Sequence, residues 1–308
     1  MRTTLRALVA AAAIVIAPTA MATDIIVISH GQANDPFWSV VKNGVDEAGK
    51  DSGANVTYRA PETFDMVAMK QLIDAAIIQE PDGIVVSIPD SDALGPSILR
   101  AVHAGIPVIT MNSGDDMSAT FGALLHVGQD DFYAGKAAGE KLAEMGGKVA
   151  ICVNHEVGNV SLDIRCDGFA EGFGGEVTVV PTNNDPAEVE AKVRAALDAN
   201  QDIDTVMSLV ATLSGEPSVA AVDASGRTGQ VNVASFDISP GFLEAIVDGR
   251  AAFAVDQQQF LQGYLPVMFL ALNAEYGLLP GGNVPSGPSL ITAETAQQVV
   301  EHSARGIR

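Results

Sequence analysis

Short apolar runs alternate with stretches of helical periodicity along most of this chain. The runs GIVVSI (83–88) and GIPVITM (105–111) are almost continuously apolar, which is typical of strands buried on both faces of a parallel sheet. Elsewhere apolar residues recur at helical spacing, as at Met66, Met69 and Ile73. This alternation predicts an α/β protein whose parallel sheets carry helices on both faces.

The chain has more strand–helix units than one sheet usually contains, so two similar lobes are expected. The boundary between the two lobes is expected near residues 112–128. The expected strands are residues 24–30, 55–60, 83–88, 105–111, 148–153, 176–181, 204–210, 231–236 and 251–256. In the second half, helices are expected at 132–145, 164–173, 187–199, 218–224, 240–248 and 262–276.

The first 22 residues have the pattern of a secretory signal peptide. Arg2 and Arg6 precede a short apolar stretch, and small residues follow at 19–22. The alternative is an uncleaved N-terminal anchor, but the stretch is short for a membrane span. No cysteine lies near the expected cleavage site, which argues against a lipid anchor. We therefore expect an exported, periplasmic protein whose mature chain begins near Thr23.

The chain is strongly acidic. Its formal charge of −21 becomes −23 once Arg2 and Arg6 are removed. Such a charge repels DNA, RNA and anionic lipid, so no nucleic-acid partner is expected. The two cysteines, Cys152 and Cys166, are expected to pair in an oxidising compartment, the alternative being two buried free thiols.

Polar residues follow nearly every expected strand. In open α/β sheets, ligands bind beyond the carboxyl ends of the strands. Phe37 and Trp38 offer flat apolar faces beside hydrogen-bonding groups after the first strand, an arrangement that suits a sugar ring, although both could be core residues. The candidate ligand-binding residues are His30, Asp35, Phe37, Trp38, Ser87, Asn112, Ser113, Asn159, Arg165, Asn184, Asp237, Asp256 and Gln257.

Several segments together resemble the type I periplasmic sugar-binding proteins, the ribose-binding class of receptors that serve ABC importers. They are HGQANDPFWSVVKNG, DGIVVSIPDSDAL, GIPVITMNSG, VASFD and FAVDQQQFLQGYLPV. The resemblance implies two Rossmann-like lobes joined by three hinge strands, with the ligand between them. The first lobe would comprise residues 23–127 and 257–287, and the second residues 128–256 and 288–308.

The resemblance also assigns roles. Asp35, Phe37 and Trp38 match the loop after the first strand, Arg165 matches the arginine that reaches the ligand from the second lobe, and Asp237 matches the acid of the family's FD motif. Ser87 stands where the family usually has an asparagine. Three further departures put ribose itself in doubt: Asn112 for an aspartate, Ser113 for an arginine and Asn184 for an aromatic residue. At the last hinge, Asp256 or Gln257 takes the place of a glutamine.

No motif in the sequence demands catalysis. The nucleophile elbow, the H-E-x-x-H zinc motif and the phosphate and dinucleotide loops are all missing from it. We expect a monomeric solute receptor without cofactor or metal, which captures a small neutral carbohydrate or polyol and delivers it to an ABC-transporter permease. The alternatives are a signalling or chemotaxis receptor of the same fold and a secreted sugar-acting enzyme.

Overall fold

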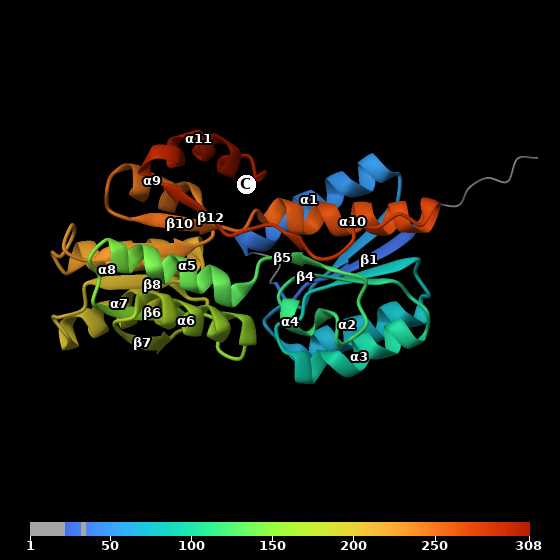
Figure 1. Ribbon diagram of the computed structural model, residues 1–308, viewed down its shortest axis with the longest axis horizontal. Helices are drawn as coiled ribbons and strands as arrows, with labels where there is room; N and C mark the ends of the chain where they lie inside the picture. The colour runs from blue at the N-terminus through green and yellow to red at the C-terminus, as the bar shows by residue number, and fades with distance from the viewer. Residues whose placement is uncertain (1–21, 32–34) are drawn as a thin grey trace, which may run out of the picture.

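The computed structural model describes residues 22–31 and 35–308, and it contains two six-stranded sheets that lie side by side (Figure 1). The strand orders are β11-β5-β4-β3-β1-β2 and β12-β10-β9-β8-β6-β7. All pairs are parallel except β10 with β12. The sequence prediction of a two-lobed α/β fold is confirmed; the expected signal peptide lies almost wholly outside the described residues.

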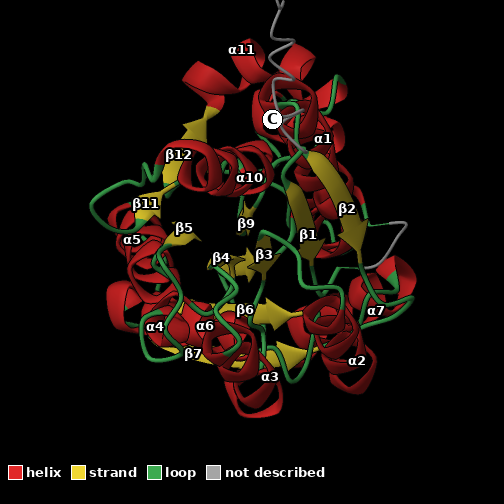
Figure 2. Cartoon of the chain, turned by 90° about the vertical axis from the view of Figure 1, so that its right-hand side faces the viewer, coloured by secondary structure: helices red, strands yellow, loops and turns green. Residues whose placement is uncertain are grey.

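The first lobe is the sheet that contains β1, together with its helices. Its strands are β1 (Asp24–Ile28), β2 (Asn55–Arg59), β3 (Gly83–Val86), β4 (Val108–Asn112), β5 (His126–Gly128) and β11 (Val284–Pro285). Its helices are α1 (Pro36–Ser52), α2 (Met66–Ile78), α3 (Ser91–His103), α4 (Asp115–Ser118) and α10 (Gln259–Tyr276). Figure 2 shows α1 and α10 on one face of this sheet and α2 and α3 on the other.

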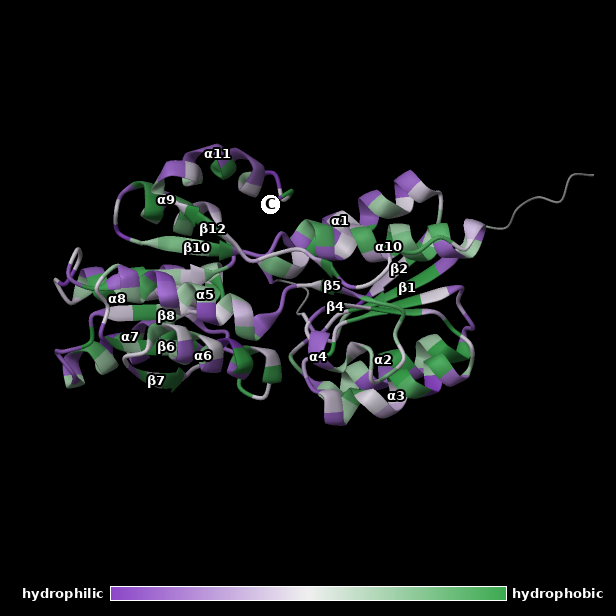
Figure 3. Cartoon of the chain, viewed as in Figure 1, coloured by the Kyte–Doolittle hydropathy of each residue, from purple (hydrophilic) through white to green (hydrophobic). Residues whose placement is uncertain are grey.

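The second lobe repeats the plan. Its strands are β6 (Val149–Asn154), β7 (Glu176–Pro181), β8 (Thr205–Ser208), β9 (Asn232–Phe236), β10 (Phe253–Asp256) and β12 (Ser289–Thr292). Its helices are α5 (Asp131–Glu144), α6 (Val160–Phe173), α7 (Pro186–Ala199), α8 (Glu216–Ala224), α9 (Pro240–Val247) and α11 (Ala293–Ala304), and a π-helical turn (Ala211–Gly215) precedes α8. Figure 3 shows hydrophobic colouring along β1 in the first lobe and along β10 in the second.

The chain crosses between the lobes three times: after β5, after β10 and between β11 and β12. The last crossing explains the antiparallel strand, because β12 returns to the second sheet directly, without a crossover helix. All three connections lie where the two lobes meet, which is where a hinge between them would have to lie. None of the helices in the described ranges is long and apolar enough to cross a lipid bilayer.

Helices α5 and α6 pack unusually closely because both carry glycines where they touch. A Cβ atom at Gly135 would lie 2.2 Å from the carbonyl oxygen of Arg165, and one at Gly168 would lie 2.1 Å from that of Phe132. A similar contact joins α1 to α10, where a Cβ atom at Gly44 would lie 2.1 Å from the carbonyl oxygen of Phe260. These glycines let helix backbones approach each other directly.

The sequence missed the short elements. Strands β5, β11 and β12 and helix α4 have two to four residues each, too few for a period to show. Helix α6 begins at Val160, four residues before the expected start, because Asn159 caps it with a side-chain oxygen that accepts from the Ser161 N–H. That shift matters because α6 carries residues of the site.

Candidate ligand-binding site

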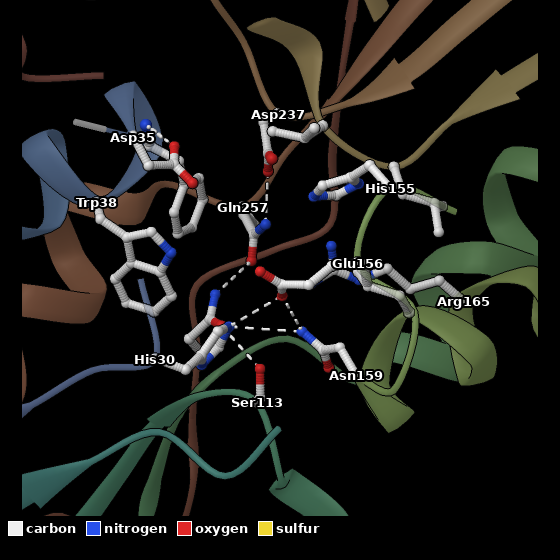
Figure 4. Close-up of a pocket in the computed structure, with 15 residues that line it drawn as sticks. His30, Asp35, Trp38, Ser113, His155, Glu156, Asn159, Arg165, Asp237 and Gln257 are labelled. Carbon is white, nitrogen blue, oxygen red and sulfur yellow. Dashed lines mark hydrogen bonds and ion pairs between the residues drawn. The ribbon is translucent and has the colours of Figure 1, made fainter. Parts of the chain in front are cut away.

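A cleft lies between the lobes, where the carboxyl ends of the strands of both sheets face each other (Figure 4). It encloses about 390 Å³ of atom-free space, a figure that includes space open to solvent at its mouth. The residues that line it are His30, Asp35, Phe37, Trp38, Asn112, Ser113, His155, Glu156, Asn159, Leu162, Arg165, Leu209, Val210, Asp237 and Gln257.

The aromatic wall comes from the first turn of α1. Asp35 caps this helix by accepting from the Phe37 N–H at 2.9 Å, and Pro36 fixes the first helical residue. The cap and the proline fix where the first turn of α1 begins, and so they position Phe37 and Trp38, which are both almost completely buried. The Trp38 ring packs edge-on against His30, with 4.7 Å between the ring centroids. A ligand ring that enters the cleft thus meets a rigid apolar surface.

His30 is held in place from below by Ser87. The Ser87 hydroxyl oxygen accepts from the His30 backbone N–H at 3.0 Å and lies 2.8 Å from Nδ1 of its ring. This contact points Nε2 of His30 across the cleft toward the second lobe. Ser87 is completely buried and does not line the cleft, so it supports His30 rather than facing a ligand.

Arg165 extends from α6 into the second-lobe wall. Its Nε donates to Oδ1 of Asp131 at 2.6 Å, and its guanidinium lies over the Phe236 ring, 4.7 Å from the centroid. Both members of this ion pair are buried. A disulfide joins Cys152 on β6 to Cys166, the next residue of α6, so the helix is covalently tied to its sheet beside the arginine.

The loop between β6 and α6 carries two cleft residues that were not among the sequence candidates for the site, His155 and Glu156. The Glu156 carboxylate accepts from Nδ2 of Asn159 at 2.8 Å, and its Oε2 lies 3.7 Å from Nε2 of His30. Figure 4 shows this carboxyl reaching the middle of the cleft. The position of both residues directly after a strand was the available signal, but the resemblance assigned no role to either.

Strand-end residues of both lobes that contact the hinge residue Gln257 or the start of α10 form the third wall. Asp237 accepts from Nε2 of Gln257 at 2.5 Å, and Nδ2 of Asn112 donates to Oε1 of Gln262 at 3.0 Å. Asn112 and Asp237 both adopt the left-handed backbone region, with φ of 63° and 64°. Non-glycine residues adopt this region at some cost, and such strain gathers at functional sites. Each turns its side chain toward the cleft at the end of a strand.

Burial shifts the titration of the cleft residues. It raises the pKa of Glu156 to about 7, of Asp237 to about 7 and of Asp35 to about 6. Burial also lowers the pKa of His30 and of His155 to about 3, and the Arg165 charge adds to both shifts. Both imidazoles are therefore neutral at pH 7, and the three carboxyls are only partly ionised.

We expect Glu156→Gln to change how stability depends on pH. The folded Glu156 pKa of about 7 exceeds its ordinary value of 4.5, so the folded state keeps a proton that the unfolded state has lost between these values. The stability contributed by this proton is fully present below pH 4.5 and is lost as the pH rises through 7. Between pH 6 and pH 8, the variant should therefore gain about 1 kcal/mol relative to wild type.

The measurement is urea unfolding at both pH values. The buried histidines oppose this trend, because their lowered pKa values make the wild type more stable as the pH rises to 6.5. For this reason the difference between variant and wild type is the informative quantity. Glu244→Gln, an exposed position on α9, is the matched control. A Glu156→Gln difference that stays constant from pH 6 to pH 8 would contradict the prediction.

Most sequence candidates line this one cleft: His30, Asp35, Phe37, Trp38, Asn112, Ser113, Asn159, Arg165, Asp237 and Gln257. Three lie elsewhere. Ser87 lies beneath His30, and Asn184 lies behind Glu156, with which it hydrogen bonds. Asp256 turns away from the cleft, and its carboxylate accepts from Nε of Arg308 at 2.7 Å. These three residues hold other side chains in place: Ser87 holds His30, Asn184 holds Glu156 and Asp256 holds Arg308. Leu162, Leu209 and Val210 are further lining residues that the sequence did not single out.

Fold and cleft together define a two-lobed receptor for a small molecule. Residues 25–277 match the family model described as "Periplasmic binding protein domain", and the chain belongs to this family.

Among its relatives is the xylose/arabinose-binding protein XylF of Sulfolobus acidocaldarius, which is 26% identical and aligns over 89% of this chain and 72% of its own length. The ribose import binding protein RbsB of Escherichia coli is 26% identical over 79% of this chain and 82% of its own length. A carbohydrate transporter from Acidothermus cellulolyticus 11B, solved with myo-inositol, is 33% identical with a TM-score of 0.87, and the match covers 94% of this chain and 100% of that one.

Proposed function

We propose that this chain is the solute receptor of an ABC importer and that it captures a small uncharged cyclic polyol between its lobes. The observation that carries the proposal is the single cleft in which the flat rings of Phe37 and Trp38 face buried carboxyl, amide and guanidinium groups. A sugar ring has apolar faces and a rim of hydroxyls, so it matches both surfaces at once.

The similar proteins support the ligand class but not a ligand name. By their descriptions, they bind xylose or arabinose, ribose, or myo-inositol, which are rings or chains of five or six carbons with several hydroxyls. The second-lobe wall here has Leu209 and Val210. These apolar side chains favour a ligand with fewer hydroxyls on that side, or one with an apolar ring face there.

Delivery would depend on closure of the lobes. A ligand held by Trp38 from the first lobe and Arg165 from the second makes both sets of contacts only when the lobes are together, so it shifts the population toward the closed state. The moving units would be residues 23–127 with 257–287 and residues 128–256 with 288–308. A membrane permease would then read the closed form. In this proposal, residues 1–22 direct export to the periplasm, and the receptor acts as a monomer.

A panel of pentoses, hexoses and inositols tests this function. We expect at least one to raise the melting temperature and to change the fluorescence of Trp38, the chain's one tryptophan. Trp38→Ala and Trp38→Leu, which keeps a larger apolar side chain than alanine, should each weaken binding at least tenfold by calorimetry, because both remove the flat face. Tyr276→Ala, at an exposed aromatic residue on α10, should bind as wild type does. A panel without any binding would overturn the proposal.

A further inference from the structure

The charges that face the cleft are unbalanced. Three carboxyls line it, those of Asp35, Glu156 and Asp237, and in the part of the chain that the structure describes Arg165 is the one lysine or arginine among the lining residues. The Arg165 charge is already matched by Asp131, whose Oδ1 lies 2.6 Å from Nε. The lining histidines stay neutral because burial lowers the pKa of each to about 3. The cleft therefore carries net negative charge.

We propose that the cleft discriminates between ligands by charge: it accepts a polyol that bears an amino group, it rejects one that bears a carboxylate or phosphate, and Glu156 is the residue that sets this preference. This inference rests on the proposed function, because it names which members of the polyol class the same site takes.

The physical reason is the cost of bringing charge into a buried site. A ligand carboxylate would face three buried carboxyls, and the one lining cation, Arg165, already shares its charge with Asp131, so the ligand's charge would be unfavourable at short range. A ligand ammonium would instead neutralise one of them and favour its ionised form. The mutual effect of these carboxyls is visible in their titration, since the Asp35 charge adds to the rise in pKa of both Glu156 and Asp237.

Glu156 is better placed than its two neighbours to meet the ligand. Asp35 uses one oxygen to cap α1 at the Phe37 N–H, and Asp237 accepts from Gln257 at 2.5 Å. Glu156 stands on the loop before α6 and extends into the centre of the cleft, where its carboxylate is held from its own lobe by the Asn159 amide at 2.8 Å and by Asn184, and its Oε2 lies 3.7 Å from the His30 ring of the first lobe. It thus faces the first lobe from the second, across the space a ligand would occupy.

Matched triads of sugars provide the first test. D-glucose, D-glucosamine and D-glucuronate form one triad, D-galactose with its amino and acid forms a second, and myo-inositol with a monoamino inositol adds a pair. In a triad whose neutral member binds, we expect the amine to bind within tenfold of it or more tightly, and the acid at least a hundredfold more weakly. In Glu156→Gln, the amine should lose at least tenfold more affinity than the neutral sugar. An acid that binds within tenfold of the neutral sugar would overturn the inference.

A second test needs no sugar and so separates this inference from the proposed function. Trp38 lies in the cleft and is the only tryptophan, so quenching of its fluorescence reports the local potential. In the ligand-free protein, caesium ion should quench more efficiently than iodide relative to neutral acrylamide. Glu156→Gln should raise iodide quenching at least 1.5-fold, whereas the surface variant Glu244→Gln should leave it unchanged. Equal quenching by both ions in wild type, or no response to Glu156→Gln, would overturn the charge preference even if neutral sugars bind.

Discussion

Arg165→Met is expected to abolish measurable ligand binding and to lower the free energy of unfolding by about 3–5 kcal/mol. The methionine keeps an unbranched apolar stem, but it is shorter than arginine and removes the charge, the donors and the guanidinium contact over Phe236. The loss of stability follows because Asp131 is buried and would keep a carboxyl with no cation beside it. Burial raises the pKa of Asp131, and the Arg165 guanidinium opposes that rise in the wild type.

The double variant Asp131→Asn with Arg165→Met separates the two effects. Replacing both charged partners removes the uncompensated carboxylate, so stability should return to within about 1–2 kcal/mol of wild type. Binding should stay lost, because the donors that face the cleft are still gone. Urea unfolding and calorimetry with a ligand from the sugar panel measure the two quantities. A double variant that is as unstable as Arg165→Met would show that the ion pair does not explain the loss.

The sequence predicted the elements whose pattern is long enough to have a period. The strand GIVVSI is predicted because nearly every residue in it is apolar, and the helix that becomes α2 because apolar residues recur every third or fourth position from Met66 to Ile77. The three crossings were expected only through the family resemblance. Strands β11 and β12 have two and four residues, and their pairing depends on distant segments rather than on their own composition.

The candidate site was predicted from one geometric rule, that parallel strands bring their carboxyl ends together. The rule placed His30, Asn112 and Asp237 correctly at the cleft. It does not say which strand-end residue faces the ligand and which faces the hinge, so Asp256 was included although it binds Arg308. Nor does it rank the residues within a loop. For this reason the rule does not single out Glu156. Its carboxyl nevertheless reaches further into the cleft than the side chain of Asn159, which caps α6.

The contact between α5 and α6 was equally invisible in the sequence, since a glycine within a helix pattern indicates weakness as readily as close packing. The structure resolves the ambiguity at Gly168, where a Cβ atom would lie 2.1 Å from a backbone carbonyl oxygen of α5. A backbone atom cannot move aside as the end of a flexible side chain can. The helices would have to separate, and Arg165 would move with α6, on which it lies less than one turn from Gly168.

We therefore expect Gly168→Ala to lower the free energy of unfolding by about 3 kcal/mol, at the upper end of the usual cost of overpacking. The sign of the stability change distinguishes the two cases. Alanine is the better helix former by about 1 kcal/mol, so it would stabilise α6 if the contact were loose. Gly281→Ala, where a Cβ atom meets nothing within 4 Å, is the control and should be nearly neutral. Urea unfolding measures both variants. A Gly168→Ala protein as stable as wild type would mean that α5 and α6 are not in direct backbone contact, and that the ion pair with Asp131 and the Cys152–Cys166 disulfide position Arg165 without it.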